Sequence, residues 1–161
     1  MRIAVTGSSG LVGSALLARL NAAGHSVAPV SRPANWNPDQ GTIDASVLDG
    51  VEAVVNLSGE NIAAGRWTAA QKSRIRESRV KSTKLISETL AKLGRPPKVL
   101  VSASATGYYG DRGNEVLRED SPPGAGFLPD VCRQWEAATS QATRAGIRVV
   151  MVTGDHAVTA R

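Results

Sequence analysis

Three evenly spaced glycines that follow a short apolar run constrain the fold of this chain more than any other feature. The run from Ile3 to Val5 predicts a buried strand, and Gly7, Gly10 and Gly13 come directly after it, where a helical pattern begins. Glycine allows a sharp turn, a close approach of backbone N–H groups to a ligand, and tight packing of a helix on a strand. The order of strand, glycine turn and helix therefore predicts an anion-binding turn.

The ligand that this turn suits best is a diphosphate. The free amides and the positive dipole end of the helix would face it. We expect the turn to hold the pyrophosphate of a dinucleotide, with cofactor-binding residues Gly7, Ser9, Gly10, Leu11, Val12 and Gly13. The spacing G-x-x-G-x-x-G departs from the usual G-x-G-x-x-G fingerprint, so an ordinary glycine-rich turn remains the alternative.

Length and composition predict one globular domain over residues 1–161. The chain has 161 residues, of which 42% are hydrophobic and 20% charged, and this balance argues against disorder. We find no apolar run of membrane-spanning length and no signal-peptide pattern, so we expect no membrane partner. The single cysteine, Cys132, cannot form an internal disulfide, which agrees with a reducing cytoplasmic location.

The net charge of +5 suits acidic ligands, either a phosphorylated cofactor or nucleic acid. The basic side chains gather at Lys72, Arg74, Arg76, Arg79, Lys81 and Lys84. That stretch has no interleaved aromatic residues and no DNA-reading motif, which favours a solvated helix face and no nucleic-acid partner. The sequence leaves the oligomeric state open, and an oligomer is compatible with it.

Short apolar runs alternate with helical patterns along the chain, which is typical of βαβ units. The predicted strands are 2–6, 26–30, a weak one at 42–44, 51–57, 98–102 and 147–152, and the predicted helices are 11–23, 68–93 and 129–145. This alternation predicts an α/β fold, a Rossmann-type doubly wound parallel sheet in three layers with strand order 3-2-1-4-5-6. Its ligand crevice should lie at the carboxyl ends of the strands.

Ser31 and Arg32 follow the second predicted strand, where an NAD site normally carries an acidic residue. A guanidinium can bind a 2′-phosphate through two hydrogen bonds, whereas a carboxylate would repel it. We therefore predict that Ser31 and Arg32 bind NADP in preference to NAD. The alternative is that Arg32 only opens the loop at Pro33.

Two further segments follow predicted strands. Leu57, Ser58 and Gly59 could line the ribose and nicotinamide of the cofactor, or form a plain turn. Ser104, with Tyr108 and Tyr109, could hold the carbonyl or alcohol of a small-molecule substrate. A tyrosine could act as general acid or base there if a neighbouring cation lowered its pKa. The alternative is that these hydroxyls cap a turn and the tyrosines pack the loop.

Several segments together resemble one family. They are residues 6–13, 56–62, 65–68, 78–83, 102–110 and 131–136. In combination they resemble the atypical short-chain dehydrogenases/reductases of the NAD(P)-dependent epimerase/dehydratase-like family, or YfcH-like epimerase family, over about residues 1–150. The resemblance implies an extended short-chain dehydrogenase fold, NADP(H) binding, and an oxidoreductase or nucleotide-sugar epimerase activity on an unassigned substrate.

The chain departs from the extended epimerases at their Tyr-x-x-x-Lys pair. Leu128 and Cys132 stand where that tyrosine and lysine would be expected, and Cys132 on the apolar side of its helix is predicted to be an unreactive thiol. Ser104 still matches the epimerase serine, and Tyr108 and Tyr109 are the nearby phenols. These departures keep open a non-catalytic dinucleotide-binding module, which would act as a cofactor sensor or an interaction domain.

The carboxyl-terminal segment is a second departure. The family continues into a lobe that holds the substrate, so a chain ending at Arg161 is expected to be truncated before it. Residues 146–161 resemble the Thr-Gly-Asp segment of P-type cation ATPases, and we treat 151–161 as an atypical tail. We assign Asp155 no role, and we expect no metal site anywhere in the chain.

Overall fold

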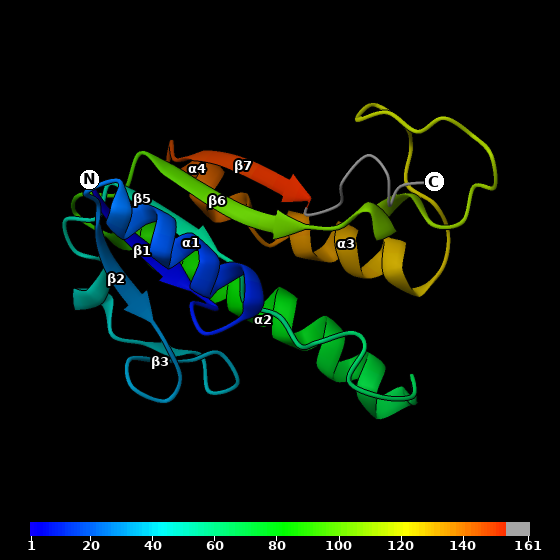
Figure 1. Cartoon of the computed structure of the whole chain (residues 1–161), viewed down its shortest axis with the longest axis horizontal. Coiled ribbons are helices and arrows are strands. Elements are labelled where there is room, and N and C mark those ends of the chain that lie inside the picture. The colour runs from blue at the N-terminus through cyan, green and yellow to red at the C-terminus, as the bar shows by residue number, and fades with distance from the viewer. Residues whose placement is uncertain (154–161) are drawn as a thin grey trace.

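The structure is a computed structural model that describes residues 1–153. Its helices and strands alternate along the chain, as Figure 1 shows. They are β1 (Arg2–Thr6), α1 (Leu11–Ala22), β2 (Ser26–Val30), β3 (Trp36–Asn37), β4 (Thr42–Ile43), η1 (Ala45–Leu48), β5 (Ala53–Asn56), α2 (Ala69–Lys92), β6 (Val99–Ser104), η2 (Thr106–Tyr109), α3 (Phe127–Ala137), α4 (Ser140–Arg144) and β7 (Arg148–Thr153). Within this described part, no helix combines the length and the apolar character that a membrane span requires.

Five parallel strands form the central sheet, in the order β2-β1-β5-β6-β7. In β1, Ile3 is in register with Val27 of β2 on one side and with Ala53 of β5 on the other. The order reverses direction at β1, so the carboxyl ends of β1 and β5 form the switch point where α/β sheets bind ligands. The predicted Rossmann-type fold is confirmed.

The predicted position of the third strand is wrong. Residues 42–44 were expected to extend the parallel sheet beyond β2, but Thr42–Ile43 pairs antiparallel with Trp36–Asn37 in a separate two-stranded ribbon. A parallel neighbour needs a crossover that passes over the sheet, usually through a helix. No helix lies between Val30 and Thr42, so the chain turns back on itself there. The main sheet therefore has five strands within the described residues, not six.

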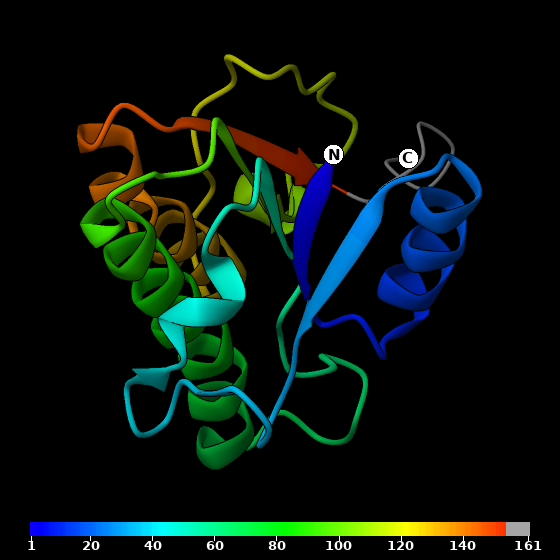
Figure 2. The same cartoon turned by 90° about the vertical axis from the view of Figure 1, so that its left-hand side faces the viewer.

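Helices cover the sheet on both faces, as Figure 2 shows, with α1 on one side and α2, α3 and α4 on the other. On the first side, Leu16, Leu17 and Leu20 of α1 pack against a core cluster that contains Val5. On the opposite side, Ile86 and Leu90 of α2 and Ala142 of α4 are buried in a larger cluster with Val54 and Leu100. This three-layer arrangement leaves the carboxyl ends of the strands open to a ligand.

The helix boundaries follow local signals with one exception. Thr68 caps α2 as predicted, since its Oγ1 accepts a hydrogen bond of 3.2 Å from the Gln71 amide. The single helix predicted over 129–145 is wrong, because it divides into α3 and α4 around Thr139. The Thr139 amide and Oγ1 both donate to the Glu136 carbonyl, at 3.1 and 2.7 Å, which tightens the turn and ends the α-helical pattern. The ATPase-like sequence from residue 154 onward, Asp155 included, lies outside the described residues.

Candidate functional site

A hollow of about 430 Å³ opens at the carboxyl ends of β1, β2 and β5. It is lined by Gly7, Ser8, Ser9, Gly10, Val30, Ser31, Arg32, Trp36, Leu57, Ser58 and Gly59. Three segments that are remote in sequence but were each predicted to touch a cofactor therefore meet around one space. The predicted residues Leu11, Val12 and Gly13 lie outside this lining, at the start of α1.

The glycine turn has no room for side chains at its two ends. Gly7 has a positive φ of 65°, and a Cβ there would lie 2.7 Å from the Leu57 carbonyl oxygen. A Cβ on Gly13 would lie 2.1 Å from the Gly7 carbonyl oxygen, so only glycine lets α1 start this close to β1. Between them, the Gly10 amide donates to the Gly7 carbonyl at 3.0 Å and closes the turn. The backbone itself therefore forms the floor of the hollow.

The start of α1 presents backbone donors to solvent. Leu11 and Val12 are 90% and 64% exposed, so their side chains point away from the packed sheet. No acceptor from residues 1–153 reaches the amides of Leu11, Val12 or Gly13. Gly10 caps the helix without a side-chain hydrogen bond. Unpaired amides at the positive end of a helix dipole are suited to bind an anion.

A polar wall follows β2. The Ser31 amide donates to Asn35 Oδ1 at 2.9 Å, and Asn35 Nδ2 donates to the Pro29 carbonyl at 3.2 Å, which fixes the turn after the strand. The Arg32 guanidinium lies 3.7 Å from the Asp39 carboxylate, with both side chains mostly exposed. An ion pair that is this exposed stabilises little. Arg32 can therefore exchange its partner for another anion at small cost.

Three lining residues, Ser8, Val30 and Trp36, were not predicted from the sequence. Trp36 is the informative one, because its side chain is only 5% exposed and joins the core cluster of α2 while still reaching the hollow. An aromatic residue within a loop rich in proline and asparagine was the available signal for it. Its contact with the site depends on the β3–β4 ribbon, whose pairing local patterns did not predict.

A buried hydrogen-bond chain, here called the Thr6–Trp135 chain, connects β1, β5, α2 and α3. Thr6 Oγ1 donates to Asn56 Oδ1 at 2.7 Å, and Asn56 Nδ2 donates to Thr83 Oγ1 at 2.8 Å. Trp135 Nε1 donates to the same Thr83 oxygen at 2.8 Å. The Leu57 amide donates to Thr6 Oγ1 at 3.2 Å, so the chain also fixes the wall that follows β5. These side chains support the site without lining it.

The predicted substrate residues lie at the end of β6 and on η2, and none of them lines the hollow. Ser104 is 8% exposed, and its Oγ donates to Glu136 Oε1 of α3 at 2.5 Å. Tyr108 and Tyr109 lie on η2 with their rings edge to face, 5.2 Å between centroids. Burial, followed by the nearby carboxylates Glu119 and Glu136, raises the pKa of Tyr109. This phenol therefore stays protonated at neutral pH and is a weaker acid than a free tyrosine, and the cation that would make it a base is not among the causes of its shift.

Leu128 and Cys132 of α3 face the turn between β6 and η2. A Cβ on Gly107 would lie 3.3 Å from Leu128 Cβ, and Cys132 Sγ donates to the Ala105 carbonyl at 3.8 Å. Cys132 is 3% exposed, and burial raises the pKa of its thiol, as expected for an unreactive cysteine. In this part of α3, apolar and thiol side chains occupy the turn instead of a phenol and an amine.

The basic stretch on α2 divides between two environments. Lys81 pairs with Glu77 and Lys84 with Glu88, at i,i+4 spacing on the exposed side. Lys72 and Arg76 instead lie over the Phe127 ring at the start of α3, 5.4 and 5.7 Å from its centroid. Among residues 1–153, no cluster of His, Cys, Asp and Glu could hold a metal ion.

Comparisons with known proteins agree with this geometry. The sequence pattern of the NAD dependent epimerase/dehydratase family matches residues 3–127. Epimerase family protein Mb2239 of Mycobacterium bovis is 46% identical over 156 residues, with 92% of this chain and 51% of the relative covered. Human epimerase family protein SDR39U1 is 37% identical over 142 residues, covering 86% and 48%. The chain thus spans about half the length of the curated relatives it matches.

Solved structures of epimerase family proteins and of a sugar epimerase have a fold similar to that of this chain. The crystal structure of human SDR39U1 (isoform 2) with NADPH superposes with a TM-score of 0.83 at 32% identity, covering 99% of this chain and 58% of that one. A nucleoside-diphosphate sugar epimerase from Corynebacterium glutamicum superposes with a TM-score of 0.81 at 41% identity, covering 95% and 33%.

Proposed function

Because the chain belongs to the NAD dependent epimerase/dehydratase family, we propose that it binds NADP(H) in the hollow at the carboxyl ends of β1, β2 and β5. We propose further that it serves an oxidoreductase or nucleotide-sugar epimerase reaction on a carbonyl or alcohol substrate. The observation that carries the proposal is the convergence of the glycine turn, Arg32 and the Leu57–Gly59 segment on one space.

The residues present fit a dinucleotide. A Cβ at Gly13 or at Gly7 would come within 2.1 or 2.7 Å of a backbone oxygen, so a larger residue would force the packed backbone segments apart and distort the turn that would hold the diphosphate. The unpaired amides of Leu11 and Val12 would donate to pyrophosphate oxygens, and the exposed helix start allows this approach. Leu57, Ser58 and Gly59 would lie along the ribose.

Arg32, with Ser31, would bind the 2′-phosphate that distinguishes NADP from NAD. Its present partner is the exposed carboxylate of Asp39, which a doubly charged phosphate would outcompete. The NADPH bound to human SDR39U1 supports the same preference in a relative that is 32% identical. NAD is the less favoured cofactor.

When bound, the nicotinamide supplies the hydride acceptor or donor of the reaction. Ser104 would orient the substrate oxygen, with its own proton held by Glu136. Tyr108 and Tyr109 would supply a phenolic proton, and the raised pKa of Tyr109 keeps it protonated for that role. The substrate, and the activity of the whole relatives, belong to this proposal because the chain spans about half of their length.

Cofactor titration tests the proposal. NADPH fluorescence should increase on binding, and NADPH should bind more tightly than NADH. Arg32→Ala should weaken NADPH binding about 10- to 100-fold, since hydrogen bonds between charged groups contribute roughly 1.5–3 kcal/mol, and leave NADH binding unchanged. Arg95→Ala is the matched control, because Arg95 forms a similar exposed pair with Asp49 at 3.5 Å and does not line the hollow. Negligible binding of both cofactors would overturn the proposal.

A second candidate function is a dinucleotide-binding module without catalysis. It is favoured by Leu128 and Cys132, which supply neither a phenol nor an amine to the turn after β6. Stereospecific transfer of the nicotinamide hydride to a panel of carbonyl substrates separates the two functions. Cofactor binding without any transfer would favour the module, whether it acts as a sensor or as an interaction domain.

A further inference from the structure

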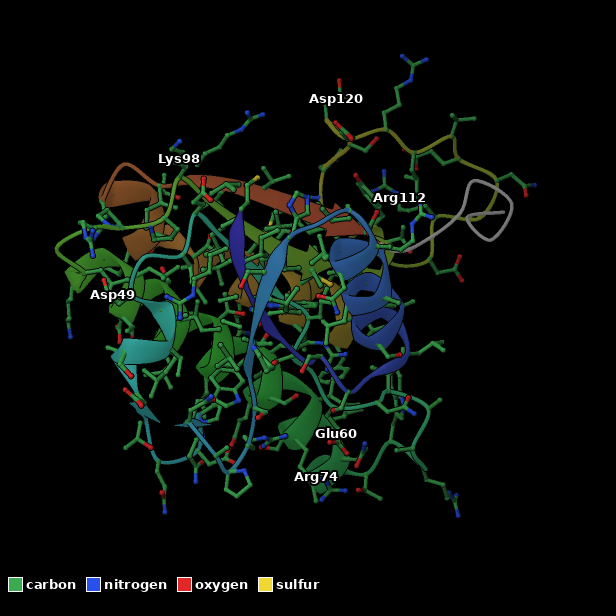
Figure 3. The ribbon with its side chains drawn as sticks, turned by 60° about the vertical axis from the view of Figure 1, so that its left-hand side comes forward. Asp49, Glu60, Arg74, Lys98, Arg112 and Asp120 are labelled. Atoms are coloured by element: carbon green, nitrogen blue, oxygen red, sulfur yellow. The ribbon has the colours of Figure 1, made fainter. Side chains whose placement is uncertain are left out.

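Two cations and two aromatic rings meet at the amino-terminal end of α2, and the proposed function does not use them. We call this surface the Phe127 patch; its members are Trp67, Lys72, Arg76 and Phe127. Lys72 Nζ and the Arg76 guanidinium lie 5.4 and 5.7 Å from the centroid of the Phe127 ring. The Trp67 ring meets the Phe127 ring edge to face, with 5.7 Å between centroids. Figure 3 labels Arg74 in the same part of α2. The segment before α2, α2 itself and the start of α3 therefore build one surface.

The charges of Lys72 and Arg76 are held in place without being neutralised. An aromatic ring attracts a cation through its quadrupole but carries no net charge of its own. Within residues 1–153, neither head group forms an ion pair or a hydrogen bond, and the carboxylates on neighbouring turns, Glu77 and Asp130, pair with other cations. The pKa of Glu77 is lowered first by its hydrogen bond with Lys81, and Arg76 is the smallest cause. Both cations are therefore free to pair with an anion.

Lys72 and Arg76 stand one helical turn apart, so their charges repel each other. Side chains at i and i+4 are neighbours on a helix surface, and like charges at this spacing are unfavourable. Both head groups also lie over the same ring, which keeps them on one side of the helix. The positive end of the α2 dipole adds to their field, since Lys72 lies in the first turn of α2. An anion bound between the two head groups would remove this repulsion.

Trp67 supplies a fixed apolar surface beside the two cations. Its Nε1 donates to the Ile62 carbonyl at 2.8 Å, and its contact with Phe127 sets the orientation of the ring. The Trp67 side chain nevertheless stays 40% exposed, whereas Trp36 and Trp135 are each 5% exposed. An indole that is held rigidly at the surface is suited to contact the ring or the apolar part of a ligand.

The Phe127 patch adjoins the turn that carries the proposed substrate residues. Phe127 is followed in α3 by Leu128, and a Cβ on Gly107 of η2 would lie 3.3 Å from the Leu128 Cβ. Tyr108 and Tyr109 follow Gly107 in η2. None of the four patch residues lines the hollow, so the patch is separate from the proposed cofactor site.

From these observations we infer that the Phe127 patch binds an anionic ligand, a phosphate or carboxylate whose ring or apolar part lies on Trp67. Resting on the proposed function, this ligand is the substrate, so the carbonyl or alcohol that reacts carries an anionic group. Lys72 and Arg76 are then substrate-binding residues. Phosphate and carboxylate oxygens both accept hydrogen bonds from an ammonium, and a guanidinium can donate two hydrogen bonds to either group.

The test uses small probes that join a ring to one of these groups. Phenyl phosphate and benzoate are titrated by ligand-observed NMR, with and without NADPH, and benzyl alcohol is the neutral control. We expect the anionic probes to bind with dissociation constants of about 1–10 mM, as suits ligands of about ten heavy atoms, and to be unaffected by NADPH. Benzyl alcohol should bind at least about tenfold more weakly. Tighter binding of phenyl phosphate would identify the group as phosphate, and tighter binding of benzoate would identify it as carboxylate.

Substitutions assign the binding to the patch. The double variant Lys72→Gln/Arg76→Gln should weaken both anionic probes at least about fivefold and leave benzyl alcohol unchanged. Lys81→Gln/Lys84→Gln is the matched control, because it removes the same charge from the same helix at residues that already form ion pairs. Probe binding to this control should stay within about twofold of the wild-type chain. Trp67→Leu should weaken the anionic probes without any change in charge.

A measurement on the wild-type chain keeps the inference testable if the double variant does not fold. Iodide should quench the exposed Trp67 more strongly relative to caesium than it does in free N-acetyltryptophanamide, because the two cations concentrate anions there. An unchanged quenching ratio, equal binding of neutral and anionic probes, or loss of probe binding when NADPH is added would overturn the inference. Absence of NADPH binding would instead overturn the proposed function, while the titrations without NADPH still decide whether the patch binds anions.

Discussion

Two regions at the carboxyl edge of the sheet, one at the end of β1 and one at the end of β6, are constructed in different ways. At the β1 end, the backbone end, glycines let the turn after β1, the start of α1 and the segment after β5 pack with their backbones in contact beside the hollow. At the β6 end, side chains from separate elements form the surface, as when Ser104 of β6 meets Glu136 of α3. The backbone end suits a ligand common to many proteins, a diphosphate, whereas the side-chain end can vary with the chemistry that each protein performs.

The Thr6–Trp135 chain joins these two ends. It begins at β1, within the backbone end, and finishes on α3, one residue before the Glu136 partner of Ser104. Its polar groups are buried and paired, so each contributes fixed geometry as well as stability. The comparison therefore predicts that substitutions at the β1 end have large, local effects on stability. Substitutions along the Thr6–Trp135 chain should affect both ends.

The largest effect is expected at Gly13. In Gly13→Val the new side chain would meet the Gly7 carbonyl oxygen at 2.1 Å and the Ser8 Cα at 2.8 Å, both of them backbone atoms that cannot rotate away. We expect a loss of at least about 3 kcal/mol in the free energy of unfolding, measured by urea denaturation, together with loss of NADPH binding.

Gly94→Ala is the control for that substitution. Nothing lies within 4 Å of a Cβ at Gly94, and its φ is not positive, so stability should change by less than about 0.5 kcal/mol. Equal stability of the Gly13 and Gly94 variants would contradict the description of the first end as a backbone surface.

A smaller effect is expected where the two ends are joined. Thr83→Val keeps the side-chain shape but removes the oxygen that accepts from Asn56 and from Trp135. Leaving two buried donors unpaired should cost about 2–3 kcal/mol in urea unfolding. Thr89→Val is the matched control on the same helix, because Thr89 only donates to the Leu85 carbonyl, and it should cost less than about 1 kcal/mol. Similar losses in both variants would show that the chain does not couple the ends.

At the side-chain end, the thiol of Cys132 is expected to react slowly with alkylating reagents. Cys132 is nearly inaccessible and burial raises its pKa, so iodoacetamide at pH 8 should modify it at least about tenfold more slowly than free glutathione. Unfolding in urea should restore the rate of an ordinary thiol. Rapid modification of the folded protein would contradict this prediction and would mean that the turn after β6 opens readily. The β6 end would then be more mobile than the tightly packed glycine turn at the β1 end.

The smallest effect concerns Tyr109. Since its pKa in the folded protein lies above the ordinary value of 10.0, the protonated phenol is favoured by the fold. The stability that the protonated Tyr109 phenol contributes is complete below the pKa that this phenol has in the unfolded chain. It is lost as the pH rises through the pKa that the phenol has in the folded protein. Tyr109→Phe should therefore reduce the loss of stability between pH 9 and pH 11, measured by thermal unfolding. If Tyr109→Phe has the same loss of stability at alkaline pH as the wild-type chain, the pKa of Tyr109 is not raised by folding.

Features that depend on neighbouring residues were predicted well from the sequence. The glycine turn, the Thr68 cap and the buried parallel strands follow from conformational limits and apolar patterns within a few residues. The convergence of Arg32 and Gly59 on the glycine turn followed from one rule, that the carboxyl ends of parallel strands share an edge.

What the sequence did not predict depends on contacts between distant elements. The ribbon of Trp36 and Ile43 replaces a sixth strand because no crossover helix precedes it, and Thr139 ends a helix whose apolar pattern continues. Arg79 was read as part of a solvated face, since nothing local indicates that Gly59 and Trp135 would lie against its guanidinium. The spacing of residues along the sequence does not indicate which distant elements come into contact.

The shared acceptor at Thr83 has a practical consequence for protein engineering. A glycine loop transplanted by itself into a new scaffold would carry the donors for a diphosphate but not the wall after β5, whose Leu57 amide is held by Thr6 and, through Asn56, by a hydroxyl on a distant helix. A working transplant therefore has to include both strands and the hydroxyl-bearing turn of α2 as one unit.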